Sequence, residues 1–347
     1  MSIERRLRLF LFLPLLCAAG VFAQQQSPPS QPRGSSIVLD VVVAPKYGKP
    51  VSGLQQQDFT LLDNKAPQTL TSFRAVDGRQ SSIDVVILID AVNAAYTNVA
   101  FERTEIDKYL RAEGGNLAHP TALAILTDKG TEMQPNFTSD GNALSASLDQ
   151  SVVSLRTINR SAGFWGASER FQLSLDGLRQ LMVQLAPHPE RKIVLFISPG
   201  WPLLSGPRVS IDDKGQQQLF SDIVGFSTQL MQNRITLYSI DPLGTADVGT
   251  RTVYWKEFLK GVSKPSQVNP GNLALEVLAT QSGGVALNAN NDITAQLQQA
   301  LGDLGTYYEL SYEPPSDNSP HEYHQIEVKI SKPGLIARTR KGYYSQP

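Results

Sequence analysis

The chain has 347 residues, of which 41% are apolar and 18% are charged, and its formal net charge is −1. This composition is typical of a globular protein and excludes a wholly disordered chain. Because there is no excess of basic residues, the composition also argues against a nucleic-acid-binding surface. The length allows two domains, or one large domain with an accessory layer.

Residues 1–23 have the pattern of a secretory signal peptide, with three arginines ahead of an apolar run from Leu9 to Ala23. The run is too short for a stable membrane span. Cys17, the only cysteine, would leave with this segment, so we expect no disulfide in the mature chain. The sequence therefore predicts a secreted or periplasmic protein without a membrane span after cleavage.

The segments at the two ends of the remaining chain read as strands. Residues 24–35 are rich in Gln, Ser and Pro and predict a flexible linker. Residues 36–80 and 306–347 each contain short strand-like runs separated by turns. Either segment is too small to hold a core alone, so we expect the two to pair into one β-rich layer.

Residues 81–305 alternate between strand-like and helix-like segments. The runs "IDVVILID", "ALAILTD", "KIVLFIS" and "ITLYSID" are continuously apolar, as strands covered on both faces should be. Helical patterns cover residues 98–112, 141–154, 166–186, 216–233, 271–282 and 291–304. This alternation predicts an α/β fold, a doubly wound and mostly parallel sheet of Rossmann-like type with helices on both faces.

Polar and turn residues stand where three of these strands end. They are Asp90, the turn Ser198-Pro199-Gly200, and Asp241. Ligands of open α/β sheets bind at the carboxyl ends of the strands. We therefore expect the functional surface at this edge, which we call the carboxyl rim.

The arrangement resembles the von Willebrand factor type A domain. More closely, it resembles the von Willebrand factor A-related family of secreted acidobacterial proteins, over most of the chain from Val38 to Tyr344. The similarity includes the front segment "VVVAPKYGKPVSGLQQQDFTLLDNKAPQTLTSF" and the closing "YYELSYEP", "IEVKIS" and "RTRKGYY". It implies a binding or adhesion module for a protein or cell-surface ligand.

The resemblance also implies a metal-ion-dependent adhesion site, but this sequence keeps only part of it. In that site an aspartate is followed at +2 and +4 by serines, and a later threonine and aspartate complete the oxygen ligands of a divalent cation. Asp90 matches the first aspartate and Thr138 the threonine. The two serine positions are held by Val92 and Ala94, which have no side-chain oxygen.

The position of the later aspartate is held by Pro199, so three of the five ligand positions are lost. Asn93 and Asp241 are the remaining oxygen donors near this motif. We interpret the site as degenerate and expect no cofactor, with a weak Mg²⁺ site on Asp90 and Thr138 as the alternative. In the favoured interpretation Asp90 is a structural residue that caps the turn after its strand.

Catalytic motifs are absent from the sequence, which contains neither a G-x-S-x-G elbow nor a phosphate-binding loop. We therefore expect a non-enzymatic binding module that contacts its ligand through loops at the carboxyl rim. The two alternatives are a metal-assisted hydrolase that uses Asp90, Asp241 and a histidine, and a structural component of the envelope. The candidate rim residues are Asp90, Asn93, Thr138, Trp165, Ser198, Trp201, Asp241 and Trp255.

Overall fold

The computed structural model describes residues 36–152, 163–202, 204, 211–244, 254–315 and 319–346. The predicted signal peptide and linker, Cys17 included, lie outside these ranges. Among the described residues, no helix has the length and apolar character needed to cross a membrane.

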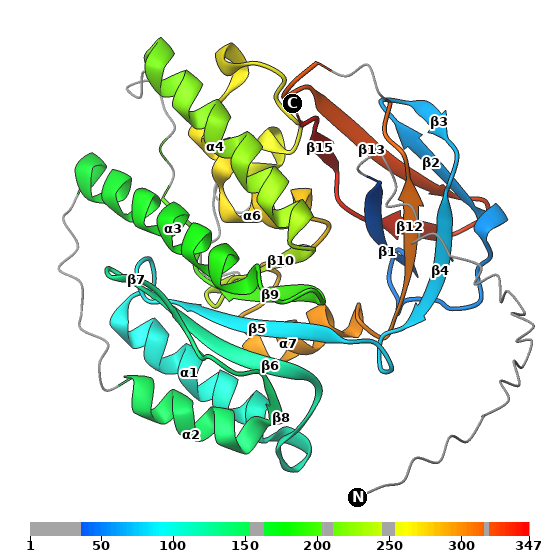
Figure 1. Ribbon diagram of the computed structural model, residues 1–347. Helices are drawn as coiled ribbons and strands as arrows, with labels where there is room; N and C mark the ends of the chain where they lie inside the picture. Colours follow the sequence, from blue (N-terminus) through cyan, green and yellow to red (C-terminus); the bar gives the residue numbers. More distant parts are fainter. Residues whose placement is uncertain are drawn as a thin grey trace, which may run out of the picture. The chain divides into compact units, whose positions relative to one another are not determined.

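A mixed sheet forms the centre of the α/β part (Figure 1), with the strand order β11-β10-β9-β5-β6-β7 and with β8 beside β6. Its strands are β5 (Ile83–Asp90), β6 (Asn116–Thr127), β7 (Gly130–Met133), β8 (Thr138–Asp140), β9 (Arg191–Ile197), β10 (Ile235–Ile240) and β11 (Ala286–Leu287). Strands β5, β6, β9, β10 and β11 pair in parallel, whereas β7 and β8 pair antiparallel with β6. The predicted α/β fold with a mostly parallel sheet is confirmed.

Helices cover both faces of this sheet (Figure 1). On one face lie α1 (Tyr96–Arg111), α2 (Gly141–Val152) and α7 (Ile293–Gly302); on the other lie α3 (Gly163–Leu185), α4 (Asp213–Gln232) and α6 (Leu275–Gln281). Each range overlaps one of the predicted helical patterns. Short 3-10 helices are η1 (Gln56–Asp58), η2 (Ala112–Gly115), η4 (Trp255–Phe258), η5 (Pro265–Gln267) and η6 (Pro270–Leu273).

The two faces explain why the central strands are apolar at every position. All residues of β5 and β9 are buried. Successive side chains of a strand point to opposite faces, so Val86 and Leu88 join the core under α3 and α4, whereas Ile87 and Ile89 join the core under α1 and α7. Complete burial of each such side chain contributes about 1.5–3 kcal/mol.

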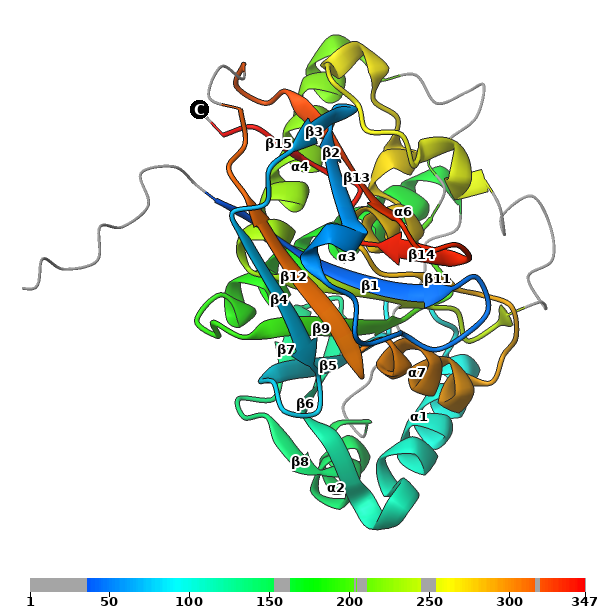
Figure 2. The ribbon, with the colours of Figure 1, turned by 90° about the vertical axis from the view of Figure 1, so that its right-hand side faces the viewer.

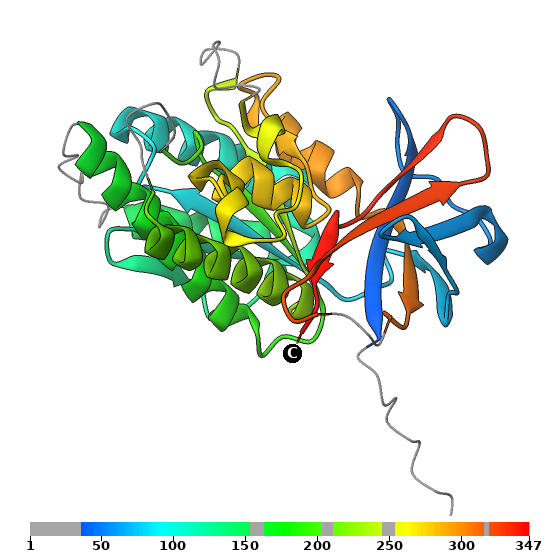
Figure 3. The ribbon, with the colours of Figure 1, turned by 90° about the horizontal axis from the view of Figure 1, so that it is seen from above.

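The terminal segments form two four-stranded antiparallel sheets (Figures 2 and 3). One has the order β14-β1-β12-β4 and the other β15-β13-β2-β3. Their strands are β1 (Ile37–Pro45), β2 (Phe59–Asp63), β3 (Ala66–Gln68), β4 (Ser72–Asp77), β12 (Thr306–Tyr312), β13 (Tyr323–Ile330), β14 (Leu335–Arg338) and β15 (Gly342–Tyr344). We call these two sheets together the β layer.

Each sheet of the β layer combines strands from both ends of the chain. Ile37 pairs with Tyr312 in the β1–β12 ladder, and Phe59 pairs with Ile330 in the β2–β13 ladder. The buried side chains of both sheets share one core. Neither terminal segment could bury these side chains without the other.

Candidate functional site

The carboxyl rim is built around the point where the strand order reverses. Strand β5 is flanked by β6 on one side and by β9 on the other, so the chain leaves β5 and β9 in opposite directions. Asp90 is the last residue of β5, and Ser198 follows β9 directly. Both are completely buried side by side at this position.

The carboxylate of Asp90 is held entirely by protein donors. Its Oδ1 accepts hydrogen bonds from the backbone N–H groups of Val92 and Asn93, both at 2.9 Å. Its Oδ2 accepts from the Asn93 amide at 2.9 Å and from the Ser198 hydroxyl at 2.6 Å. Asn93 also donates to Ser174 of α3 at 2.8 Å, which ties this helix to the turn. Asp90 thus caps the turn that follows its own strand.

These hydrogen bonds argue against the alternative of a weak Mg²⁺ site on Asp90 and Thr138. Each oxygen of Asp90 already accepts two hydrogen bonds, so its lone pairs point at protein donors rather than at a space for a cation. Val92 and Ala94 are buried, one in each of the two cores. Burial raises the pKa of Asp90, while the hydrogen bonds from Ser198 and Asn93 oppose that shift.

Thr138 does not lie at the rim, which corrects its assignment as a metal ligand. It begins β8, where it pairs with Thr121 of β6. Thr121 in turn pairs with Val85, five residues before Asp90 on β5, a separation of about 16 Å along a strand. The Thr138 hydroxyl instead accepts from the N–H of Asp140, the last residue of β8. The register of this short antiparallel strand could not be read from the sequence.

Asp241 stands at the rim but on a different strand end from Asp90. It follows β10, and β9 runs between β10 and β5. One carboxylate oxygen of Asp241 accepts from the N–H of Leu243 at 2.9 Å. Its backbone carbonyl accepts from the side chain of Gln296 at 3.2 Å. Asp241 therefore supports the loop after its own strand.

Glu102 is a buried acid that the sequence interpretation missed. It lies on α1 with no exposed surface, and neither of its carboxylate oxygens has a hydrogen-bond partner among the described residues. Burial, with the nearby charges of Asp90 and Asp241, raises the pKa of Glu102 to about 9. The sequence does contain a signal for this burial. Val99, Glu102 and Ile106 follow one another at helical spacing, which places Glu102 on the buried face of the helix.

The three tryptophans have different environments. Trp165 is 82% exposed in the first turn of α3, where its ring centroid lies 5.9 Å from that of Phe164. Trp201, only 1% exposed, packs edge-on against Phe171 and Phe196. Trp255, 8% exposed, joins a small cluster with Ala274 and Val277. The expectation that Trp201 and Trp255 meet a ligand is thus wrong, because both rings are buried against the protein core.

The histidines lie away from the carboxyl rim. His119 lies two residues before Thr121 in β6 and is therefore near the opposite, amino edge of the sheet. His188 stands near the same edge, with its Nδ1 3.5 Å from Asp84 at the start of β5. His321 and His324 belong to the β layer, where Nδ1 of His324 lies 2.8 Å from Asp63.

One group at the amino edge has the donor types of a metal site. The ligand atoms of Asp84, His188 and Glu190 lie within 4.8 Å of one another. The side chain of Lys192, however, donates to the backbone carbonyls of His188 and Glu190 at 2.5 and 2.8 Å. Burial lowers the pKa of Lys192, while the carboxylates of Asp84 and Glu190 oppose that shift, so the lysine amine interacts with both acids of this group. We interpret the group as an ion-pair network.

No protein-family model matches the sequence, and no curated protein is similar to it. Solved structures with partial similarity include the human COPII-coat protein Sec24c (9% identity, TM-score 0.35, 77% of this chain and 44% of the other). The pilus adhesin SpaC from Lactobacillus rhamnosus GG has 10% identity and a TM-score of 0.38, with 86% of this chain and 50% of the other covered.

A third structure is the manganese-loaded TRAP protein of Plasmodium vivax, with 8% identity and a TM-score of 0.33. The match covers 79% of this chain and 98% of the TRAP chain. By contrast, this chain spans about half the length of the coat protein and of the adhesin. Similarities at this level assign neither a family nor a ligand.

Proposed function

We propose that this protein is a secreted, metal-independent binding module that holds a protein or cell-surface ligand at the carboxyl rim. The observation that carries the proposal is the exposed aromatic pair Phe164 and Trp165 at the start of α3. Their exposed fractions are 51% and 82%, and their rings contact each other edge to face. Tryptophan is enriched at the energetic centres of protein interfaces because it combines a large apolar area with few torsions.

The position of the pair supports a role in binding. Helix α3 contacts the rim at Ser174, which accepts a hydrogen bond from Asn93. From there it runs toward the opposite edge of the sheet and ends at Leu185, before the amino end of β9. Trp165 precedes Ser174 by nine residues, which is about 13 Å along a helix axis. The first turn of α3 thus extends beyond the rim, where a large ligand has access to both rings.

A hydrolase is less well supported. That function needs Asp90, Asp241 and a histidine to converge around a substrate. Strand β9 separates the strands that end at Asp90 and Asp241, and the histidines lie at the amino edge or in the β layer. The hydrogen bonds that saturate Asp90 also leave it unsuited to bind a catalytic cation.

Site-specific photo-crosslinking tests the proposal. A benzoylphenylalanine is placed at position 165 and, in a control protein, at Val183, which is 71% exposed near the other end of the same helix. Each protein, without its predicted signal peptide, is irradiated with the isolated envelope and intact cells of the producing organism. A binding rim predicts discrete adducts from position 165 that Phe164→Ser diminishes, and none from position 183.

Equal crosslinking from positions 165 and 183, or none from 165, would contradict a ligand at the start of α3. Adducts that survive Phe164→Ser would indicate a structural contact instead of recognition by the aromatic pair. Adding a chelator during irradiation tests the metal-independent part separately, because the proposal predicts the same adducts with and without it.

A further inference from the structure

Arginines from distant parts of the sequence meet where the β layer faces the amino ends of β9 and β10. Arg191 is the first residue of β9, Arg234 directly precedes β10, and Arg340 lies between β14 and β15. All three line one small cavity, together with Asp40 of β1 and Thr339. Three guanidinium groups therefore share a cavity that has a single carboxylate in its lining.

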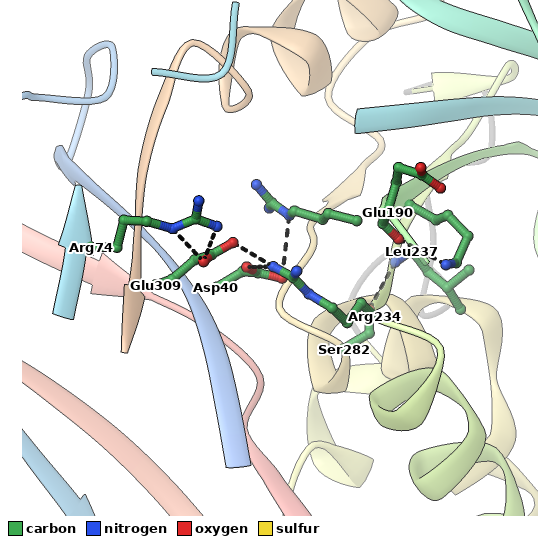
Figure 4. A network of polar contacts seen from close by, with 9 residues as sticks. Asp40, Arg74, Glu190, Arg234, Leu237, Ser282 and Glu309 are labelled. Atoms are coloured by element: carbon green, nitrogen blue, oxygen red, sulfur yellow. Dashed lines mark hydrogen bonds and ion pairs between the residues drawn. The ribbon is translucent and has the colours of Figure 1, made fainter. Parts of the chain in front are cut away.

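The available carboxylates are already engaged by Arg234. Its Nη2 donates to Asp40 at 2.7 Å and to Glu309 of β12 at 2.6 Å. Figure 4 shows this chain of contacts, in which Arg74 approaches Glu309 from the other side; its Nε donates at 2.9 Å. The second oxygen of Asp40 lies 3.5 Å from Nε of Arg191, an ion pair without a hydrogen bond.

The remaining cationic groups are buried, with N–H groups that lack hydrogen-bond partners among the described residues. Arg340 is 7% exposed and, among the described residues, forms neither a hydrogen bond nor an ion pair, and its Nε is fully covered. Arg191 is 3% exposed and stacks on Tyr307 at 4.2 Å, but its Nε and Nη1 lack hydrogen-bond partners among the described residues. The hydroxyl of Thr339, another buried donor, also lacks one.

The fold holds these groups in place. Gly283, with φ +98°, lies so close to the backbone of residues 339 and 340 that a Cβ would stand 2.8 Å from the nitrogen of Arg340. A residue with a side chain would push this segment away from the cavity. The Arg234 backbone is also in the left-handed region, at φ +49°, which is uncommon outside glycine. The arrangement is preformed and does not depend on mobile surface side chains.

Burying a guanidinium without a counter-charge is costly, because the protein must replace the water that would solvate it. The pKa values of the neighbouring groups reflect this burial. Burial lowers the pKa of Arg340 to about 10, and burial together with the charge of Arg191 lowers the pKa of His119. Water molecules could satisfy the orphaned N–H groups, but they would not neutralise the charge.

We propose that this cavity binds a small oxyanion of the size of phosphate or sulfate, with Arg191, Arg234 and Arg340 as its ligands. Guanidinium groups present paired N–H donors that match the oxygens of such an ion. The cavity volume is about 30 Å³, roughly the space that two water molecules need. That size suits an inorganic oxyanion and excludes a nucleotide. The bound ion would join the β layer to the α/β part through charge.

Calorimetric titration and thermal unfolding with inorganic phosphate, sulfate and chloride at matched ionic strength test the site. We expect saturable phosphate or sulfate binding and a rise in Tm that chloride does not reproduce. Arg340→Gln should weaken phosphate binding about 10- to 100-fold, since it removes charge-assisted hydrogen bonds. Asp40→Asn should act in the opposite direction and tighten binding about tenfold or more, because it removes the one negative charge in the lining.

Arg103→Gln is the matched control, because Arg103 pairs with Asp149 on the far side of the sheet; it should leave phosphate binding unchanged. If Arg340→Gln does not fold, phosphate binding is measured with Thr339→Val and Asp40→Asn in its place. Equal effects of chloride and phosphate, or unchanged affinity in Asp40→Asn, would overturn the proposal. So would a crystal soaked in selenate whose cavity holds only water.

Discussion

The hydroxyl of Ser198 donates a 2.6 Å hydrogen bond to Oδ2 of Asp90, between the ends of the neighbouring parallel strands β9 and β5. Both side chains are completely buried. The serine thereby occupies one of the directions from which a cation would approach the carboxylate. Together with the two N–H groups and the amide of the following turn, it makes Asp90 an internal cap.

Asp90→Ala should therefore destabilise the protein in the absence of any metal. The substitution leaves buried donors on Ser198, Asn93 and the backbone without an acceptor, each at a cost of about 1–3 kcal/mol. We expect the free energy of unfolding in urea to fall by about 3 kcal/mol or more. Asp212→Ala is the matched control, since Asp212 is an exposed N-cap of α4, and its loss should cost about 1 kcal/mol.

Titration of the wild-type protein with Mg²⁺ and Mn²⁺ tests whether the carboxylate of Asp90 binds a cation. We expect no saturable binding tighter than about 1 mM, the weak end of the range for extracellular divalent-cation sites. Tighter binding that disappears in Asp90→Ala would contradict the capped-turn interpretation. Binding that persists in Asp90→Ala would instead indicate a cation site elsewhere. The group of Asp84, His188 and Glu190 would then be the first candidate.

Glu102 should make the stability of the protein depend on pH. Its pKa is about 9 in the folded state and has an ordinary value of 4.5, so the folded state holds this proton more tightly than the unfolded state does. Its contribution is complete below about pH 4.5 and is lost as the pH rises toward 9, by about 1.4 kcal/mol per pH unit. Glu102→Gln keeps the shape without the charge, so its stability relative to wild type should increase between pH 5.5 and 8.5.

Urea unfolding at pH 5.5, 7 and 8.5 measures this difference. Glu132→Gln, at an exposed position of β7, serves as control and should run parallel to the wild type. A constant difference between Glu102→Gln and wild type across this range would mean that Glu102 does not hold its proton in the folded protein.

Local patterns were sufficient to predict the architecture. The buried runs of β5 and β9 and the periodic face of α4 follow from side-chain spacing alone. The replacement of both serine positions by Val92 and Ala94 could also be read locally, because these residues stand directly beside Asp90. In both cases the determining residues are close neighbours in the chain.

Contacts between particular side chains of distant elements could not be predicted. The burial of Trp201 is decided by Phe171 and Phe196, which come from other elements. The place of Thr138 depends on the register of an irregular ladder. The arginine cavity combines residues 191 and 234, which are neighbours through the β9–β10 ladder, with residue 340 from the segment between β14 and β15.

Fluorescence quenching should separate the three tryptophans. Trp165 is open to solvent, whereas Trp201 and Trp255 are enclosed. Acrylamide should therefore quench one component of the emission efficiently and leave the other two nearly unaffected. Trp165→Phe should remove the quenchable component, and Trp201→Phe should retain it. Efficient quenching that persists in Trp165→Phe would show that one of the enclosed rings is exposed in solution.

The carboxylate of Asp63 should hold the β layer together. It is 2% exposed, and its Oδ2 accepts from the hydroxyls of Tyr312 and Tyr343 at 2.9 and 2.8 Å, while its Oδ1 meets Nδ1 of His324 at 2.8 Å. These partners come from β12, β15 and β13, so one side chain links both sheets. Asp63→Ala leaves three buried polar groups unpaired and should lower the free energy of unfolding by about 3–5 kcal/mol.

A double-mutant cycle with Tyr312→Phe isolates one link of this network. Tyr312→Phe alone should cost about 1.5–3 kcal/mol, the usual contribution of a hydrogen bond to a charged group. Because both substitutions remove the same bond, the double variant should lose at least 0.5–1 kcal/mol less than the two single losses combined, within the roughly 0.5–3 kcal/mol seen for groups in contact. Tyr308→Phe, which removes a hydroxyl bound to the carbonyl of Val51, provides the unlinked comparison and should be additive with Asp63→Ala. Additivity for Tyr312 as well would mean that Asp63 stabilises the β layer by some route other than this hydrogen bond.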